Sequence, residues 1–214
     1  MKLYRFVYSP YARKVQMLLE LLGIEHEVVE VNYVEREELA TVTGGYIMVP
    51  VLIEDDGTVL VDSRHICERI VETRGHRLVP EPLEGPIWAY SDFVDGPLED
   101  ILFRIASPCV RDRWTTAFER GLYVFSKERK FGTGCVDAWA RDRDELMSKG
   151  RRLLSPTLRT LERRPFLFGA EPTLADAALY GVCAMLEAAK PELLSELSPI
   201  LVDFARRLEA ERRP

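Results

Sequence analysis

The spacing of apolar and polar residues divides the chain into a first part with strands and a second part made of helices. Residues 2–9 ("KLYRFVYS") and 25–32 ("EHEVVEVN") have the apolar or alternating pattern of short strands. Between them, "YARKVQMLLELLG" repeats apolar residues at helical spacing and ends in Gly23, a common helix terminator. A strand–helix–strand unit is therefore predicted within the first 35 residues.

A hairpin and another helix are predicted next. The stretch "VPVLIEDDGTVLVD" has two short apolar runs around Asp55-Asp56-Gly57, which is a strong hairpin signal. The segment before it, "EREELATVTGG", fits either a short helix or an irregular loop. The stretch "DSRHICERIVETRG" predicts a helix that Asp62 or Ser63 caps and that Gly75 ends.

A segment rich in proline and glycine, "HRLVPEPLEGP", separates the two parts and is the best domain boundary in the chain. We expect one domain over residues 1–75, a linker over 76–85 and a second domain over 86–214. After the boundary the strand signals stop. The apolar spacing predicts helices over 86–106, 109–128, 137–163, 173–189 and 198–212.

Composition and charge narrow the function classes. The 214 residues are 47% hydrophobic and 30% charged, which is typical of a soluble globular protein. A net charge of -6 argues against a broad surface for nucleic acid or anionic lipid. The N-terminus lacks the apolar region of a secretory signal, and no apolar run is long enough to span a membrane. We therefore expect a cytoplasmic protein with neither a nucleic-acid nor a membrane partner.

The four cysteines are scattered along the chain, and no pair has the spacing of a redox or metal-binding motif. We expect reduced, mostly buried thiols at Cys67, Cys109, Cys135 and Cys183. His65 is the one histidine beside a cysteine, and it lies two positions from Cys67 on a predicted helix, so the two side chains diverge. No metal site is predicted.

Four short motifs together resemble the cytosolic glutathione S-transferase family, with the N-terminal motif of its serine type. They are "SPYARKV" at 9–15, "VPVL" at 49–52, "DS" at 62–63 followed by Ile66, and "PTLADAALYG" at 172–181. The resemblance implies a thioredoxin-like N-terminal domain, in which a cis proline at Pro50 faces the start of the first helix, and an all-helical C-terminal domain. The last motif implies a capping box between Thr173 and Asp176, with a role in folding.

The resemblance also implies how a thiol would be activated. A free thiol titrates near ~8.5, and only the thiolate is a good nucleophile. A cysteine at position 9 would favour disulfide exchange, whereas the hydroxyl of Ser9 can only donate a hydrogen bond to a bound thiolate. The start of the following helix adds positive potential. Arg13, one turn along, is expected to support Ser9, and a solvated surface arginine is the other interpretation. Tyr8 is an alternative activating group, and strand alternation favours Ser9.

Further residues are expected to bind glutathione. The backbone of Val49, ahead of Pro50, would pair with the cysteinyl unit of glutathione as an added strand does. Asp62 and Ser63 stand where the family binds the γ-glutamyl end, although simple helix capping explains both as well. Tyr11 belongs to the same motif as Ser9, and packing is its other interpretation. Met48 occupies a position where many members have lysine or glutamine, which puts one contact to the glycyl carboxylate in doubt.

The resemblance predicts a glutathione transferase that attacks a small hydrophobic electrophile or a peroxide, with glutathione as co-substrate, no metal, and a role in detoxification. The family also predicts a homodimer. A glutathione-dependent isomerase and a non-catalytic binding or regulatory protein of the same fold remain alternatives. Trp88, Phe93, Phe103 and Trp114 are candidates for the walls of an electrophile cleft, although aromatic residues at helical spacing usually belong to the core.

Overall fold

A small mixed sheet forms the centre of the N-terminal part. The computed structural model describes residues 1–213, and its strands are β1 (Lys2–Arg5), β2 (Glu27–Glu30), β3 (Val51–Ile53) and β4 (Val59–Val61). Their order in the sheet is β2-β1-β3-β4. β1 pairs parallel with β2 and antiparallel with β3, and the β3–β4 hairpin turns at Gly57, which has φ 87°. The predicted strand–helix–strand unit and hairpin are both confirmed.

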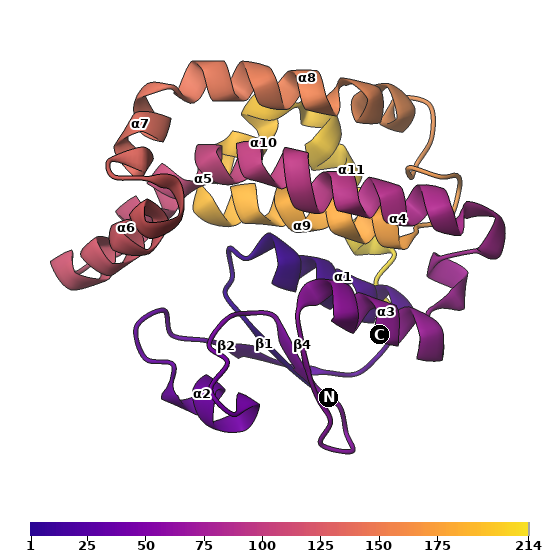
Figure 1. Cartoon of the computed structure of the whole chain (residues 1–214). Helices are drawn as coiled ribbons and strands as arrows, with labels where there is room; N and C mark the ends of the chain where they lie inside the picture. The colour runs from indigo at the N-terminus through magenta and orange to yellow at the C-terminus, as the bar shows by residue number, and fades with distance from the viewer. Residues whose placement is uncertain (214) are drawn as a thin grey trace.

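Three helices cover the two faces of this sheet. α1 (Pro10–Leu22) and α3 (Ser63–Arg74) lie on the face toward the C-terminal helices, and α2 (Glu37–Thr43) lies on the opposite side (Figure 1). A small buried cluster of Tyr4, Leu39 and Val51 joins α2 to the sheet. The arrangement is a thioredoxin-like domain, as predicted, and the segment before β3 is the short helix of the two alternatives.

The second part of the chain is helical. Two 3₁₀ turns (His76–Leu78 and Glu81–Leu83) lead into α4 (Glu84–Phe93), a π-helical turn (Val94–Leu98) and α5 (Glu99–Arg113). The remaining helices are α6 (Ala117–Phe131), α7 (Cys135–Arg141), α8 (Arg143–Leu161), α9 (Leu174–Ala189), α10 (Glu192–Leu197) and α11 (Pro199–Ala210). The predicted combination of a thioredoxin-like domain and a helical domain is confirmed, whereas the boundary over 76–85 stays a prediction.

The predicted break between the first two helices of this part was wrong. α5 runs through the buried Pro108 and ends only at Arg113. The chain breaks instead at Thr116, where the side chain of Glu119 accepts hydrogen bonds from the backbone (3.0 Å) and hydroxyl (2.7 Å) of Thr116. Packing of α5 in the core thus overrides the local cost of a proline, and the capping box decides where the next helix begins. The single helix predicted over 137–163 is likewise two helices, α7 and α8.

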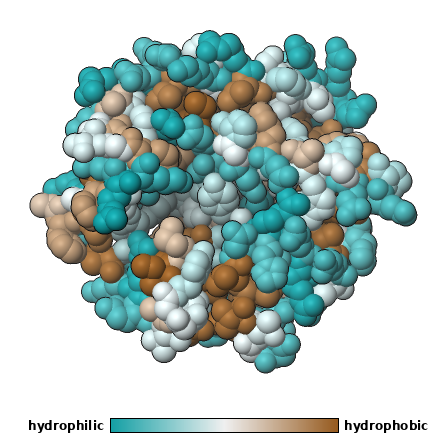
Figure 2. Space-filling view, in the orientation of Figure 1, coloured by the Kyte–Doolittle hydropathy of each residue, from teal (hydrophilic) through white to brown (hydrophobic). Residues whose placement is uncertain are grey.

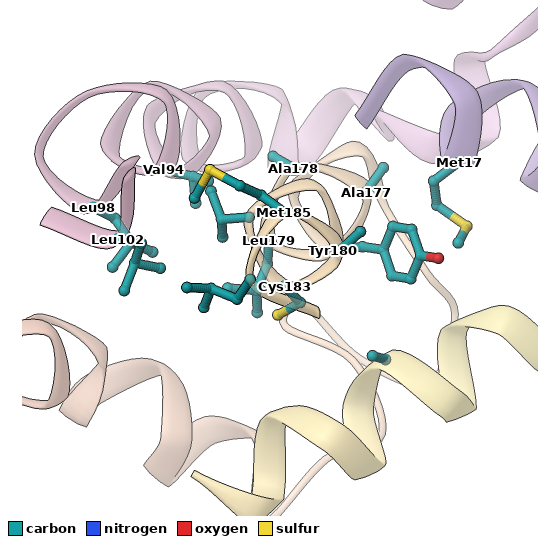
Figure 3. Close-up of a cluster of buried hydrophobic side chains, with 14 of the residues drawn as sticks. Met17, Val94, Leu98, Leu102, Ala177, Ala178, Leu179, Tyr180, Cys183 and Met185 are labelled. Carbon is teal, nitrogen blue, oxygen red and sulfur yellow. The ribbon is translucent and has the colours of Figure 1, made fainter. Parts of the chain in front are cut away.

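α9 is the central helix of the hydrophobic core. It packs against α1, α4, α5, α10 and α11, and nearly all of its side chains are buried. Figure 3 shows Met17 of α1 and Leu102 of α5 approaching it from different sides. The predicted capping pair lies at its start, where buried Asp176 accepts hydrogen bonds from the backbone N–H (2.8 Å) and hydroxyl (2.7 Å) of Thr173.

A glycine brings α1 and α9 into close contact. A Cβ atom at Gly181 would lie 2.4 Å from the carbonyl oxygen of Pro10 and 3.2 Å from Lys14 Cβ. Only glycine allows this approach of backbone to backbone. Because Pro10 directly follows Ser9, the contact fixes the start of α1 against the helical domain.

Candidate active site

Ser9 caps the N-terminus of α1. β1 ends at Arg5, and the chain then turns, with the Ser9 N–H donating to the carbonyl of Phe6 at 2.9 Å. The Ser9 hydroxyl accepts a hydrogen bond from the Ala12 N–H at 3.3 Å, which leaves its own hydrogen available for a ligand. The side chain is nearly buried. A donor at the positive end of a 13-residue helix suits the binding of an anion.

Tyr8 and Ser9 both follow the end of β1 and lie in the turn, so strand alternation does not decide which way they point. They still face different surroundings. The Tyr8 ring stacks on Phe6, with centroids 5.6 Å apart, and its hydroxyl is buried without a hydrogen-bond partner. Burial raises the pKa of Tyr8, so its phenol stays protonated at neutral pH.

Arg13 points toward the helical domain. Its guanidinium donates to the Tyr180 hydroxyl of α9 at 3.2 Å and to Gln16 at 3.3 Å, while its buried Nε has no partner. Arg13 is therefore half-buried at the interface of α1 and α9 rather than a solvated surface residue. These hydrogen bonds lead away from Ser9, and the expected support of Ser9 stays a prediction.

Tyr11 faces the junction of the π-helical turn and α5. Its hydroxyl donates to the carbonyl oxygen of Asp95 at 3.2 Å. Burial, and then the charges of Glu99, Asp95 and Asp62, raise the pKa of Tyr11. Burial also raises the pKa of Glu99 to about 7. α3 packs against α1, so Asp62 at its start is near enough to contribute to the raised pKa of Tyr11.

The Val49–Pro50 peptide bond is cis, as the resemblance implies. The β1–β3 ladder ends at the Tyr4–Val51 pair, so Val49 precedes the ladder, and its backbone can pair with a ligand. Pro50 is buried and Val49 is half-buried. Met48 beside them is 53% exposed and so presents an apolar side chain to solvent at the edge of this segment.

Asp62 and Ser63 lie at the start of α3. Asp62 is an exposed residue with φ 70°, an uncommon backbone angle for a residue other than glycine. Its carboxylate caps α3 by accepting from the Arg64 N–H at 2.8 Å and the His65 N–H at 3.3 Å. Ser63 is buried beside it. Capping is present, and the exposed carboxylate can also meet a ligand ammonium group, so the two interpretations are compatible.

An aromatic cluster lies on the other side of the Ser9 turn. Tyr33 contacts three of its rings, with centroids 5.6 Å (Phe6), 5.1 Å (Trp114) and 5.7 Å (Tyr123) away. Tyr8 meets Trp114 edge-on at 6.2 Å. The indole N–H of Trp114, like the hydroxyl of Tyr8, is buried without a partner. We call these five residues the aromatic cluster: Phe6, Tyr8, Tyr33, Trp114 and Tyr123.

Of the aromatic residues suggested as cleft walls, only Trp114 is part of this cluster. Trp88 lies under the Arg64 guanidinium at 4.0 Å, Phe93 packs on Tyr90, and Phe103 packs on Trp139. Tyr33, after β2, and Lys127, on α6, were not predicted as site residues from the sequence. The aromatic character of residues 4–11 pointed to one side of the cluster, but no local pattern pointed to the partners.

The four thiols are free, as expected, and three of them are buried. Burial raises the pKa of Cys67 to about 11, which makes it a poor nucleophile at neutral pH. Within residues 1–213, no group of three His, Cys, Asp or Glu side chains is placed to hold a metal ion. Over the same residues, no helix combines the length and apolar character that crossing a membrane requires.

Protein-family models match both parts of the chain. The model of the glutathione S-transferase N-terminal domain matches residues 3–78, and the model of the C-terminal domain of the same family matches residues 114–211. Together the two models span most of the chain. The first matches the part with the sheet, and the second matches most of the helical part.

Solved structures share this fold. A glutathione transferase of Phanerochaete chrysosporium has a TM-score of 0.81 at 16% identity, over 100% of this chain and 97% of that one. A glutathione S-transferase of Ceriporiopsis subvermispora, solved with glutathione, has a TM-score of 0.80 at 15% identity, over 98% and 95%. One from Rhodospirillum rubrum has a TM-score of 0.65 at 21% identity, over 100% and 88%. At these identities the likeness establishes the fold alone.

Proposed function

Because the chain belongs to the glutathione S-transferase family, we propose that it is a glutathione transferase that activates the thiol of glutathione through Ser9. The observation that carries the proposal is the Ser9 hydroxyl at the N-terminus of α1, with its hydrogen available for a bound sulfur. Glutathione bound to the Ceriporiopsis relative agrees with glutathione as co-substrate here.

Two effects at the N-terminus of α1 would favour ionisation of the glutathione thiol. A hydroxyl that donates to sulfur favours the thiolate over the thiol, and the helix terminus adds positive potential. A hydrogen bond to a charged group contributes about 1.5–3 kcal/mol, which corresponds to a thiol pKa lowered by about one to two units. The thiolate then attacks an electrophilic carbon, or reduces a peroxide.

The remaining site residues supply binding. The backbone of Val49 pairs with the cysteinyl unit, and the start of α3 takes the γ-glutamyl end, with Asp62 on the ammonium group and Ser63 on the carboxylate. Tyr11 borders the same space. The exposed position of Asp62 and its unusual φ support this assignment, because strained backbone is concentrated at functional sites.

The thiol pKa of bound glutathione tests the proposal. Thiolate absorbance is recorded against pH for the wild type, Ser9→Ala and Tyr8→Phe. We expect a depressed pKa in the wild type and in Tyr8→Phe, and a return of about one unit or more toward the free value in Ser9→Ala. A depressed pKa that only Tyr8→Phe reverses would assign activation to Tyr8.

One observation favours the non-catalytic alternative. Met48 is exposed where many family members have a side chain that can meet the glycyl carboxylate, so affinity for glutathione could be low. Retention on glutathione resin separates the two functions. A protein that is not retained, and that shows no thiolate signal at millimolar glutathione, would be a binding or regulatory protein instead.

We also propose a homodimer in the cytoplasm, with detoxification of small electrophiles as the role. Large apolar side chains are exposed on α6 and on the loop before β3, at Phe118, Phe125, Ile47 and Met48. Hydrophobic patches are seen on the same side of the molecule in Figure 2. Light scattering tests the dimer, and Phe125→Asp is expected to weaken it if this patch is the interface.

A further inference from the structure

Two cationic side chains lie against the aromatic cluster from different elements. The Arg36 guanidinium, at the start of α2, lies 4.7 Å from the ring centroid of Tyr33 and 5.0 Å from that of Phe6. The Lys127 ammonium group of α6 lies 4.7 Å from the ring centroid of Tyr123. The same ammonium group is 5.2 Å from the ring of Phe103 on α5. Two cations, one at the start of α2 and one on α6, therefore lie against rings of the cluster.

Within the described residues 1–213, Lys127 forms no ion pair with an acidic side chain. The lysines that form ion pairs within residues 1–213 are Lys2, Lys14 and Lys149. Burial, and then the charges of Lys130 on the same helix and of Arg36 at the start of α2, lower the pKa of Lys127 to about 8. Glu99 of α5 and Cys135 of α7 act in the opposite direction, but they do not compensate. Lys127 is half-buried, and an anion would stabilise a cation that has like charges nearby.

A groove passes beside Arg36 and reaches Tyr33 of the aromatic cluster and Ser126, the residue before Lys127 on α6. It encloses about 450 Å³ between α2 and α6, and Arg36, Ile47, Leu122 and Ser126 contribute to its walls. Exposed Glu37 also borders it. In Figure 2 the surface is hollowed between the sheet and α6, where this groove lies. The walls combine apolar side chains with one permanent cation.

The cluster itself offers unsatisfied donors. The hydroxyl of Tyr8 and the indole N–H of Trp114 are both buried without an acceptor. Buried donors of this kind cost stability unless a ligand satisfies them. Tyr8 precedes Ser9 in the chain, so the aromatic cluster begins at the same turn as the proposed thiolate site.

We propose that the electrophile carries a carboxylate beside an aromatic or unsaturated electrophilic centre, and that Lys127, assisted by Arg36, binds that carboxylate. The inference rests on the proposed transferase function and names the class of its second substrate. The apolar part of the electrophile lies on the aromatic cluster, and the negative charge satisfies the two cations. The Arg36 guanidinium already donates to the carbonyls of Tyr33 (2.9 Å) and Ile47 (3.0 Å), so a wholly apolar electrophile would leave Lys127 as the cation without a polar partner.

A chloronitrobenzoate shows how such a substrate reacts. The glutathione thiolate attacks the ring carbon that bears chlorine and forms a C–S bond, and the nitro groups hold the extra electron pair in the adduct. The C–Cl bond then breaks, and chloride leaves with its electron pair. The thiol proton has already gone to solvent, and the carboxylate is unchanged throughout, so it serves only for binding.

The test compares 4-chloro-3,5-dinitrobenzoate with its neutral counterpart 4-chloro-3,5-dinitrobenzamide. The variants are Lys127→Met, which removes the charge, and Lys127→Arg, which keeps it. Lys149→Met on α8, where Lys149 pairs with Glu145, is a matched control for the loss of a lysine. We expect Lys127→Met to lower kcat/KM for the benzoate about 10-fold or more, the effect of one hydrogen bond to a charged group. The benzamide should change less than about 2-fold, and Lys127→Arg should restore the benzoate.

The pH profile adds a signature that a structural role would not produce. The ratio of kcat/KM for benzoate over benzamide cancels the ionisation of glutathione, which both reactions share. In the wild type this ratio should fall above a pH of about 8, where Lys127 loses its proton. In Lys127→Arg it should stay flat, because a guanidinium keeps its charge to far higher pH.

Other outcomes overturn the proposal. Equal losses on both substrates, or no loss on either, would show that Lys127 does not select a carboxylate. A rise in KM for glutathione, but not for its glycyl ethyl ester, would assign Lys127 to glutathione itself. If the wild type turns over neither substrate, the transferase function fails. Calorimetry with the benzoate alone then tests the carboxylate site by itself. If the wild type binds the benzoate and Lys127→Met does not, the carboxylate site stands. If both bind it equally, or neither binds it, the carboxylate site is refuted.

Discussion

Lys14 on α1 is buried and Lys127 on α6 is half-buried, and the surroundings of the two lysines differ. Lys14 is 1% exposed and forms an ion pair with Asp95 at 2.5 Å. Lys127 lies against aromatic rings, and burial depresses its pKa. The Ser9 turn lies between these two regions, since Lys14 is on the helix that Ser9 begins and Tyr8 belongs to the aromatic cluster.

We call the α9 side, where most polar groups have partners, the supporting region, and it contrasts with the aromatic cluster, where two donors have none. On the α9 side, the Tyr180 hydroxyl donates to Glu209 at 2.7 Å and accepts from Arg13 and Arg212. The unpartnered Arg13 Nε is the exception there. In the aromatic cluster, two donors have no acceptor. Natural proteins keep such uncompensated groups where function needs them, at a cost in stability.

We expect the largest loss of stability from a change at Gly181, where α9 makes its closest contact with α1. Gly181→Ala would place a methyl group 2.4 Å from the Pro10 carbonyl, so α1 would have to move away from α9. We expect a loss of about 3 kcal/mol or more in the free energy of unfolding, measured by urea denaturation. Gly121→Ala on α6 is the control, because its new methyl group meets nothing within 4 Å apart from its chain neighbours and the backbone of its own helix. That variant should be as stable as the wild type or about 0.5–1 kcal/mol more stable. Equal effects of the two would refute the packing argument.

Removal of the paired lysine should come next. Lys14→Met leaves the carboxylate of Asp95 beside the π-helical turn without its cation. Breaking a buried pair costs about 3–5 kcal/mol, and because the Asp95 side chain keeps some contact with water we expect about 2 kcal/mol. Urea denaturation of Lys14→Met and of the double variant Lys14→Met/Asp95→Asn checks this. The double variant should recover part of the loss, and a further loss would contradict the ion-pair explanation.

Several elements outside the aromatic cluster could be predicted from the sequence because the residues that determine them are close together in the chain. The hairpin at Gly57, the cap at Ser9 and the Thr173–Asp176 pair each depend on residues a few positions apart. The helix break expected before Pro108 failed because packing of α5 outweighs a local proline penalty.

The aromatic cluster could not be predicted in this way. It joins rings from the Ser9 turn, from the segment after β2, from the end of α5 and from α6, and only the fold brings these together. The missing partner of Lys127 is equally invisible in the sequence, because it is a property of everything that surrounds the side chain. The predicted ligand-binding motifs are short stretches of sequence, whereas the features that suggest the second substrate come from residues far apart in the chain.

Removal of the unpaired lysine should have the opposite sign to removal of Lys14. The folded-state pKa of Lys127 is about 8, below its unfolded value near ~10.4, so the charged lysine destabilises the folded state at pH 7. Lys127→Met should therefore raise the free energy of unfolding by about 1.5 kcal/mol, after allowance for partial exposure. The unfolded state holds more protons between pH 8 and about 10.4, so wild-type stability rises there relative to the variant. Denaturation at pH 7 and pH 9.5 should show the gap closing, and a gap independent of pH would exclude the charge as its cause.

The smallest effect concerns two hydroxyl groups in the same cluster. The Tyr8 hydroxyl is buried without a partner, whereas the Tyr123 hydroxyl lies 2.9 Å from the hydroxyl of Ser107. Tyr8→Phe removes an unsatisfied polar group and should stabilise the ligand-free protein by up to about 1 kcal/mol. Tyr123→Phe breaks a hydrogen bond and should destabilise it by about 1 kcal/mol. Thermal unfolding in the absence of ligand compares the two variants under identical conditions. If both lose stability equally, the Tyr8 hydroxyl has a partner such as an ordered water, and the donor proposed to face the electrophile is already occupied.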